Sequence, residues 1–375
     1  MDSLVPTHAA AAAGGPASQT KAMSQPAERR YRPATEVVFV DTAPGSADAG
    51  AGAGNPVNDA YGASSVPIYQ TATFKQISAN GGGDYDYSRS ESHVAKLMSA
   101  NRAFAVASGM SALDVITRMV KAGEEIVAGD DIYGGTHRLL TYLSAHSGVR
   151  VHHVDTSDPE AVLAVLNQRT RLVLLETPTN PLLTVCDVPR VAADVHRLCK
   201  RALVVVDNTM MSPYLQKPLE LGADIVYHSG TKYLSGHHDL MAGVIGVRSA
   251  ELAEVRDPCR YAGGRKQGPD DGCDAFMERE TGPEPVSHPG SPGPAAAAQA
   301  NAMRIAQYLE MRGFRVFYPG LPSHPQRELH YRMSRGPGAV LSFVTGDVSF
   351  SERIVEAPRL WGISVSFGCV NSLIR

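Results

Sequence analysis

Cysteine is scarce in this sequence, and no two cysteines form a close pair. Five cysteines occur among 375 residues without any Cys-x-x-Cys spacing, so neither a zinc knuckle nor a disulfide framework is expected. Unpaired thiols are typical of a reducing compartment, and we predict a cytoplasmic protein. The five are Cys186, Cys199, Cys259, Cys273 and Cys369.

Long hydrophobic runs and a surplus of positive charge are also missing. No stretch reaches the roughly 18 consecutive apolar residues that a membrane helix requires, and the formal net charge is −3. Neither a membrane nor a nucleic acid is therefore an expected partner. The segment Met1–Arg32 lacks the apolar core of a secretory signal.

Two common catalytic fingerprints are absent. No Gly-x-Gly-x-x-Gly opens a helix after the first predicted strand, which argues against a dinucleotide site. No nucleophile elbow supports Ser-His-Asp hydrolysis. His237, His238 and Asp239 resemble metal ligands, but without a third spaced ligand they are read as a polar turn, and no metal is expected.

The composition that is present predicts a globular protein with a large core, because 43% of the residues are hydrophobic. Residues 1–60, rich in Ala and Gly, predict a disordered arm. Residues 61–250 predict a large domain and residues 299–375 a smaller one. Between them, residues 251–298 contain many Gly and Pro residues and predict an irregular insert.

From Asn101 onward, short β-branched runs alternate with segments of helical period, which is typical of βα units. We predict an α/β fold with a mostly parallel, seven-stranded sheet. Helical spacing covers Ser111–Val120, Asp158–Leu166 and Asp187–Leu198. The predicted strands are Ala103–Val106, Glu125–Ala128, Arg150–Val154, Arg171–Leu175, Leu203–Val206, Asp224–Tyr227 and Gly243–Val247.

Two predicted strands end in groups that suit pyridoxal 5'-phosphate (PLP). Asp207 follows one apolar run, and Lys232 follows the next, 25 positions later. A lysine amine can condense with the aldehyde of PLP, and a carboxylate can pair with its protonated ring nitrogen. Taken singly, the lysine fits a solvated loop and the aspartate a helix cap. Together, at the carboxyl ends of strands, they predict one PLP crevice.

Other strand ends carry groups that could complete this crevice. Gly109 and Met110 lie between a strand and a helix, where free N–H groups favour a phosphate, and Ser229 and Thr231 add hydroxyl donors. Each motif is also compatible with an ordinary turn. We predict in addition that the Tyr133 ring stacks on the pyridine and that Asn180 donates to its phenolic oxygen. Tyr133 and Lys232 are the predicted catalytic residues.

These motifs resemble the PLP-dependent trans-sulfuration enzymes of Cys/Met metabolism, over Tyr61–Ser249 and again from Gln299 onward. The runs around Asp207 and Lys232 are similar to those of cystathionine β-lyases, including fungal ones. The resemblance implies the aminotransferase-like fold type I, with a small α+β C-terminal domain. It also implies cystathionine as the substrate and a homo-oligomer built as a dimer of dimers. By the same resemblance, Tyr87 and Arg89 reach the phosphate of a neighbouring subunit, and Ser366 belongs to a substrate-binding loop.

Three features depart from that family. The loop after Ser90 is shorter, residues 255–298 do not read as the family's helical segment, and Arg375 comes too early for the carboxylate-binding arginine. We therefore expect a truncated C-terminal domain, in which PLP binding persists better than turnover. Two alternatives stay open. One is a cystathionine γ-lyase or γ-synthase, and the other is an impaired relative that still binds PLP.

Overall fold

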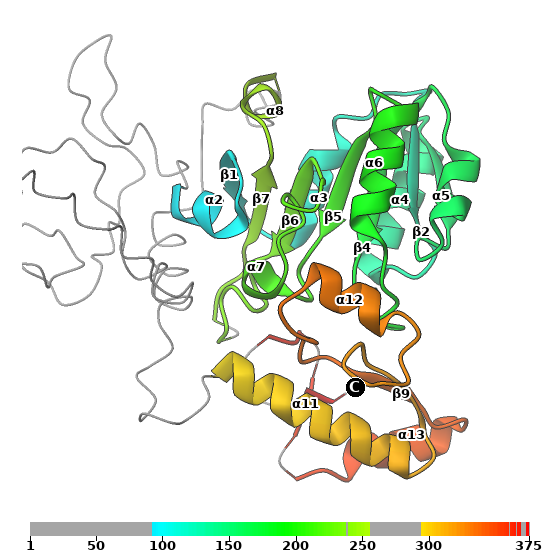
Figure 1. Ribbon diagram of the computed structural model, residues 1–375, viewed down its shortest axis with the longest axis vertical. Coiled ribbons are helices and arrows are strands. Elements are labelled where there is room, and N and C mark those ends of the chain that lie inside the picture. Colours follow the sequence, from blue (N-terminus) through cyan, green and yellow to red (C-terminus); the bar gives the residue numbers. More distant parts are fainter. Residues whose placement is uncertain are drawn as a thin grey trace, which may run out of the picture.

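The computed structural model describes residues 92–237, 239–255, 294–359, 361–364, 366–368 and 373–374. A seven-stranded sheet flanked by helices forms the larger part, and a smaller domain lies beyond one edge of it (Figure 1). The strands are β1 Arg102–Val106, β2 Glu125–Gly129, β3 Arg150–Val154, β4 Thr170–Glu176, β5 Leu203–Asp207, β6 Ile225–Ser229 and β7 Gly243–Val247.

The strand order in the sheet is β1-β7-β6-β5-β4-β2-β3. Neighbouring strands pair in parallel from β6 through β5, β4 and β2 to β3, whereas β7 runs antiparallel to both β6 and β1. The prediction of a mostly parallel, seven-stranded sheet is confirmed. We call the edge where the parallel strands end the carboxyl edge, and the opposite edge the amino edge.

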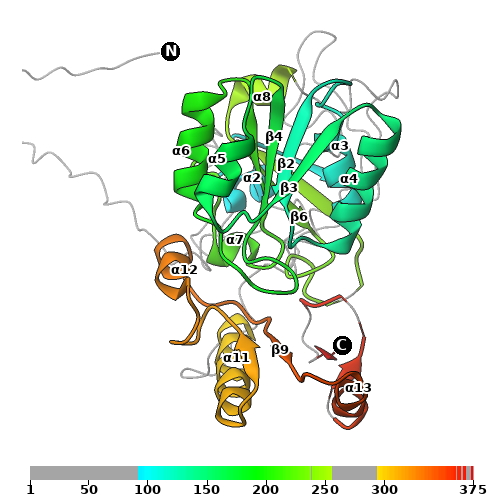
Figure 2. The ribbon, with the colours of Figure 1, turned by 90° about the vertical axis from the view of Figure 1, so that its right-hand side faces the viewer.

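Helices cover both faces of the sheet (Figure 2). Because side chains alternate along a strand, Val204 and Val206 of β5 belong to the same hydrophobic cluster as residues of α2, α5 and α6, while Val205 belongs to the cluster that includes α3 and α4. The two faces thus enclose two hydrophobic cores. The helices of the larger domain are α2 Ser92–Met98, α3 Gly109–Thr117, α4 Gly134–His146, α5 Pro159–Val165, α6 Val188–Leu198, α7 Ser212–Leu215 and α8 Ala250–Val255.

Local capping sets where α5 and α6 begin. The side chains of Asp158 and Asp187 accept hydrogen bonds from backbone N–H groups in the first turns of these helices, and a proline occupies the first or second position of each helix. Such caps satisfy donors that the helix itself leaves free. Both helices therefore begin within one residue of their predicted starts.

The smaller domain packs below the carboxyl edge and touches the larger domain through several hydrogen bonds. The backbone N–H of Arg335 donates to the carbonyl of Leu215 (2.8 Å), and the Ser342 hydroxyl donates to the carbonyl of Pro181 (2.7 Å). Its own core includes the buried Tyr318. Its elements are α11 Pro294–Met311, β8 Arg315–Phe317, α12 Arg327–Met333, β9 Ser342–Val344, α13 Val348–Glu356, β10 Gly362–Ile363 and β11 Leu373–Ile374.

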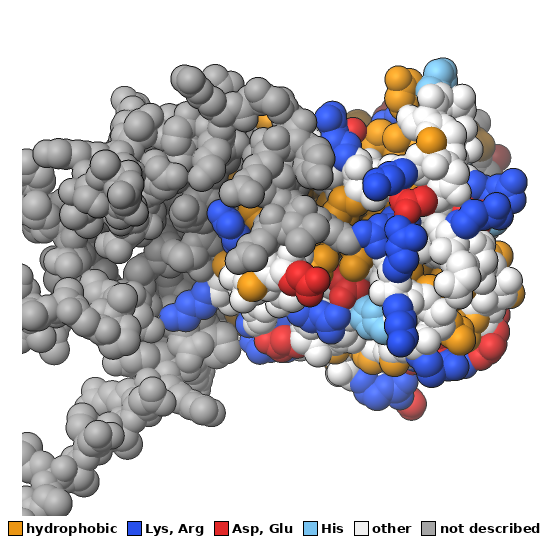
Figure 3. All heavy atoms as spheres, turned by 90° about the horizontal axis from the view of Figure 1, so that it is seen from above, with side chains coloured by type: hydrophobic (Ala, Val, Ile, Leu, Met, Phe, Trp, Pro, Cys, Tyr) orange, Lys and Arg blue, Asp and Glu red, His pale blue; other side chains and the backbone are white. Residues whose placement is uncertain are grey.

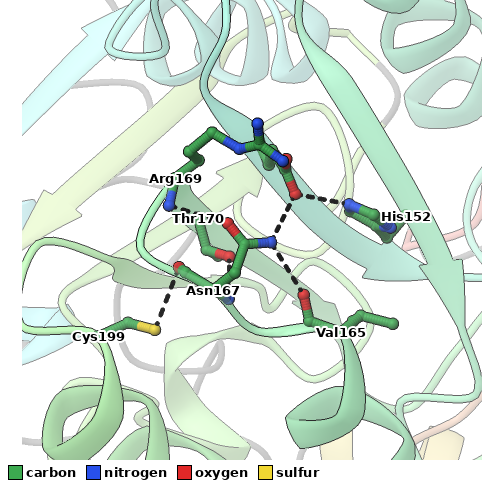
Figure 4. A network of polar contacts seen from close by, with 7 residues as sticks. His152, Val165, Asn167, Arg169, Thr170 and Cys199 are labelled. Atoms are coloured by element: carbon green, nitrogen blue, oxygen red, sulfur yellow. Dashed lines mark hydrogen bonds and ion pairs between the residues drawn. The ribbon is translucent and has the colours of Figure 1, made fainter.

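The amino edge carries two buried carboxylates, each held by a histidine and an arginine. Glu125 accepts hydrogen bonds from His152 and Asn167 (both 2.7 Å) and pairs with Arg169 (2.8 Å; Figure 4). Asp224 is bound in the same manner by His196 (2.7 Å) and Arg248 (2.5 Å). Seen from this side, Lys and Arg side chains are spread over the described surface (Figure 3).

Within the described ranges, no helix combines the length and apolar character needed to cross a membrane. The same residues contain no group of three or more His, Cys, Asp or Glu side chains arranged to hold a metal ion.

Candidate active site

Three polar residues end adjacent parallel strands at the carboxyl edge. Glu176 is the last residue of β4, Asp207 of β5 and Ser229 of β6. In the strand register Glu176 is the partner of Asp207, and Asp207 is the partner of Tyr227. Lys232 lies in the turn that directly follows β6. The structure therefore places Asp207 and Lys232 at the same edge of the sheet, as the sequence predicted.

Asp207 is surrounded by hydrogen-bond donors. The backbone N–H of Thr209 (2.9 Å) and its hydroxyl (2.5 Å) both donate to Asp207 Oδ1. Burial raises the pKa of the Asp207 carboxyl, although hydrogen bonds from Thr209 and Tyr227 oppose that rise. The Thr209 hydroxyl also accepts a hydrogen bond from the N–H of Ser229 (2.8 Å). It thereby joins the ends of β5 and β6.

A close approach of backbones forms a cradle beside Ser229. A Cβ atom added to Gly109 would lie 2.8 Å from Ser229 Cβ, and one added to Gly243 would lie 2.9 Å from the Gly109 nitrogen. Glycine is thus required at both places for the start of α3 to meet the end of β6. The Ser108 side chain caps α3 by accepting from the Ser111 N–H (3.1 Å). This junction brings the predicted phosphate ligands Gly109 and Ser229 together.

Met110 and Tyr133 both lie against Gly135. A Cβ atom on Gly135 would lie 2.8 Å from Met110 Sδ and would also collide with the Tyr133 ring. Tyr133 precedes α4, and its side chain remains 46% exposed, so its ring is accessible to a planar ligand. The hydroxyl of Thr231, another predicted phosphate ligand, instead accepts a hydrogen bond from the backbone N–H of Ala242 (3.2 Å).

Lys232 is held by a segment of the smaller domain. Its Nζ atom donates to the Ser366 hydroxyl (2.7 Å) and lies 5.4 Å from the centre of the Phe367 ring. Burial lowers the pKa of the Lys232 amine, which favours the neutral form that can act as a nucleophile or base. We call Ser366–Gly368 the lysine-facing segment.

Sequence reasoning missed Glu176, which lies at the centre of the predicted residues. Its Oε2 atom accepts from the backbone N–H of Tyr133 (2.9 Å), and its carboxyl also receives the N–H of Asn180. The signal that identified Asp207, a carboxylate closing an apolar strand, applies equally to Glu176. Tyr87 and Arg89 lie outside the described residues.

The residues present fit PLP. Asp207 is a buried carboxylate whose pKa is raised, so that a protonated ring nitrogen would relieve an uncompensated charge. The glycine-lined cradle at Gly109 and Ser229 leaves backbone N–H groups at the start of α3, where an anion is favoured. Lys232 carries a partly buried amine with a lowered pKa. The three groups match the ring nitrogen, the phosphate and the aldehyde of PLP.

The sheet and this site define a PLP-dependent enzyme of fold type I. Residues 50–279 and 294–375 match a family described as Cys/Met metabolism PLP-dependent enzymes, and the chain belongs to that family.

Relatives and solved structures agree with this assignment. The chain is 55% identical to cystathionine beta-lyase of Neurospora crassa, over 92% of this chain and 72% of the relative. It is 44% identical to cystathionine beta-lyase of Schizosaccharomyces pombe, over 93% and 86%. It also superposes on the crystal structure of cystathionine gamma synthase from Xanthomonas oryzae pv. oryzae with cystathionine (TM-score 0.77, 30% identity, 92% and 86% coverage). The predicted family is confirmed.

Proposed function

We propose that the protein is a carbon–sulfur β-lyase that cleaves cystathionine to homocysteine, pyruvate and ammonia with PLP. The observation that carries this proposal is the Lys232 amine, which lies at the same sheet edge as Asp207 and is held 2.7 Å from Ser366. The fungal relatives that share much of the chain carry the same activity in their names.

The chain's own residues suit the steps of such a cleavage. PLP supplies an electron sink for the charge that develops when the substrate loses its Cα proton. Lys232 is the group that removes this proton, and burial helps because it lowers the pKa of the amine. Ser366 orients the amine through its hydrogen bond with Lys232. Asp207 would hold the ring nitrogen of PLP in its protonated form, and the Tyr133 ring would stack on the cofactor. We propose that the Asn180 side chain donates to the phenolic oxygen of the cofactor.

The principal alternative is γ-cleavage or γ-synthesis. The likeness to a cystathionine gamma synthase favours it, because that fold carries a related reaction on the same type of sheet. A catalytically impaired chain that still binds PLP is the second alternative. Its motivation is that the predicted neighbour-subunit ligands Tyr87 and Arg89 precede a shortened loop.

Product analysis with cystathionine tests these proposals. We expect homocysteine and pyruvate from the purified chain, whereas γ-cleavage gives cysteine and 2-oxobutyrate. Lys232→Ala should abolish both the products and the visible absorption of bound PLP that borohydride removes. Lys121→Ala, at an exposed lysine on the amino edge, is the matched control. PLP binding without any product would support the impaired chain instead.

We further propose that the active form is a homo-oligomer, a dimer of dimers, because the family pattern implies that Tyr87 and Arg89 act across a subunit boundary. The cytoplasm is the proposed location, since Cys186 and Cys199 are buried free thiols. Sedimentation velocity of PLP-loaded protein tests the first proposal, and a monomer with full activity would contradict it.

A further inference from the structure

Glu176 connects three parts of the candidate site without belonging to the predicted ligand set. It ends β4 with 8% of its surface exposed, beside its strand partner Asp207. Its carboxyl receives the backbone N–H of Tyr133 at 2.9 Å and that of Asn180. The Glu176 side chain therefore links Asp207, the predicted partner of the ring nitrogen, to the two loops that carry Tyr133 and Asn180.

The charges around Glu176 are unfavourable to a second anion. Asp207 faces it from β5 and Asp131 from the loop after β2, and the largest influences on its pKa include these two acidic groups but no lysine or arginine of the described residues. The charge of Glu176 also raises the pKa of two buried neighbours, Tyr227 on β6 and Cys186. Burial and then Asp207 raise the pKa of Glu176 well above its usual range, against the two backbone N–H groups.

The donors are distributed unequally between the two carboxyls. Asp207 receives two hydrogen bonds from Thr209 (2.9 and 2.5 Å) and one from the Tyr227 hydroxyl. These groups stabilise its anion. Glu176 has two backbone donors but two acidic neighbours. When two carboxyls are this close, one of them holds the proton more tightly.

We propose that Glu176 is a positioning residue that retains a proton while Asp207 is the anion, so that the pair presents a single negative charge to the ring nitrogen. This proposal rests on the proposed PLP-dependent function for the identity of that ring. The neutral Glu176 carboxyl keeps its acceptor oxygen on the Tyr133 N–H and thereby holds the stacking loop against β4. If both Glu176 and Asp207 were ionised, the two carboxylates would repel each other and displace Asp207 from its position.

Infrared spectroscopy of the PLP-loaded full chain tests the proton directly. A protonated carboxyl gives a carbonyl stretch that an ionised carboxylate lacks. We expect such a band near neutral pH, shifted by labelling with ¹³C-glutamate but not with ¹³C-aspartate, and absent from Glu176→Gln. The labelling alone identifies the residue type, so the test stands even where the variant folds poorly. A band that follows aspartate, or no band, would overturn the assignment.

The pH dependence of stability provides a second readout. The pKa of Glu176 is higher in the folded state than in the unfolded state. Its contribution to the free energy of unfolding is therefore present below the unfolded pKa and is lost as pH rises through the folded pKa. The Tm of Glu176→Gln minus that of wild type should therefore increase with pH. Glu125→Gln is the matched control, since the pKa of Glu125 is lowered; its deficit should shrink as pH falls. A pH-independent Tm difference for Glu176→Gln would refute the proposal.

Cofactor binding separates this proposal from the function on which it rests. We expect PLP affinity in Glu176→Gln to stay within about tenfold of wild type, because the amide preserves the neutral charge. A larger loss of affinity in this folded variant would mean that Glu176 acts as an anion. If wild-type protein fails to bind PLP, the proposed function fails, while the infrared band of the PLP-free chain still decides the state of Glu176.

Discussion

Substituting Gly368 by alanine should separate the lysine-facing segment from Lys232. Gly368 has φ +100°, and a Cβ atom there would lie 2.6 Å from the carbonyl carbon of Lys232 and 2.9 Å from its Cα. Both neighbours are backbone atoms, so neither can rotate out of the way. The segment must move, and the 2.7 Å hydrogen bond from Lys232 to Ser366 should be lost.

The magnitude follows from two separate costs. A left-handed backbone costs a residue with a Cβ atom about 1–2 kcal/mol, and overpacking against fixed atoms costs about 1–3 kcal/mol. Gly346 isolates the first cost, because it has φ +79° but nothing within 4 Å of an added Cβ. Gly346→Ala should therefore lose about 1–2 kcal/mol of unfolding free energy, and Gly368→Ala about 2–5 kcal/mol if the segment stays in place.

Urea unfolding and steady-state cystathionine cleavage together test this reasoning. If the segment detaches instead, Gly368→Ala should lose less stability, but kcat/KM should fall by at least about tenfold, because Lys232 is no longer oriented. Gly346→Ala should keep its activity. A Gly368→Ala protein with wild-type kcat/KM and no more loss of stability than Gly346→Ala would show that the segment is not packed on Lys232.

Three further predictions concern single side chains. Ser366→Ala removes the hydroxyl that accepts from Lys232, so kcat/KM should fall about 10–100-fold, in line with about 1.5–3 kcal/mol for a charged hydrogen bond; an unchanged kcat/KM would contradict the orienting role. Asp207→Asn should weaken PLP binding by a similar factor, measured by fluorescence titration, and undiminished affinity would remove Asp207 from the ring nitrogen. Burial lowers the pKa of His228 to about 3 from 6.5. Its contribution to the free energy of unfolding is therefore present above pH 6.5 and is lost as pH falls towards 3, by at most about 1.4 kcal/mol per pH unit. Urea unfolding of His228→Phe across this range should show a shallower loss than wild type, and parallel curves would argue against His228.

The sheet could be predicted closely from sequence because its strands are short β-branched runs between breaks. Each of the seven observed strands overlaps its predicted range with ends displaced by no more than two residues. The helix α4, Gly134–His146, was not predicted, since it opens with two glycines and has few buried positions. The reversed direction of β7 is not encoded in its apolar run. It follows from the connection between β6 and β7, whose described residues 230–237 and 239–242 form no helix.

The candidate site was only partly predictable. Asp207 and Lys232 could be found because Asp207 ends a strand and Lys232 lies in the turn after the next strand. Their position at the same edge of the sheet then follows from the parallel order of those strands. The contact between Lys232 and Ser366 joins residues 134 positions apart and was not predicted. Ser366 had been assigned only by resemblance, to a substrate-binding loop. The role of Thr209 could not be predicted, because its hydroxyl links β5 to β6 by hydrogen bonds that only the folded structure shows.

The buried carboxylates at the two edges of the sheet have different roles because their neighbours differ. At the amino edge, burial alone would raise the pKa of Glu125, yet hydrogen bonds from Asn167 and His152 and the charge of Arg169 lower it. Such a carboxylate is already compensated, and removing one of its partners would leave a buried charge unpaired. At the carboxyl edge, Asp207 and Glu176 have raised pKa values, and the main influences on them among the described residues include no arginine or lysine. The Asp207 anion is therefore available to pair with a cationic ligand, so substituting Glu125 should impair folding, whereas substituting Asp207 should impair PLP binding.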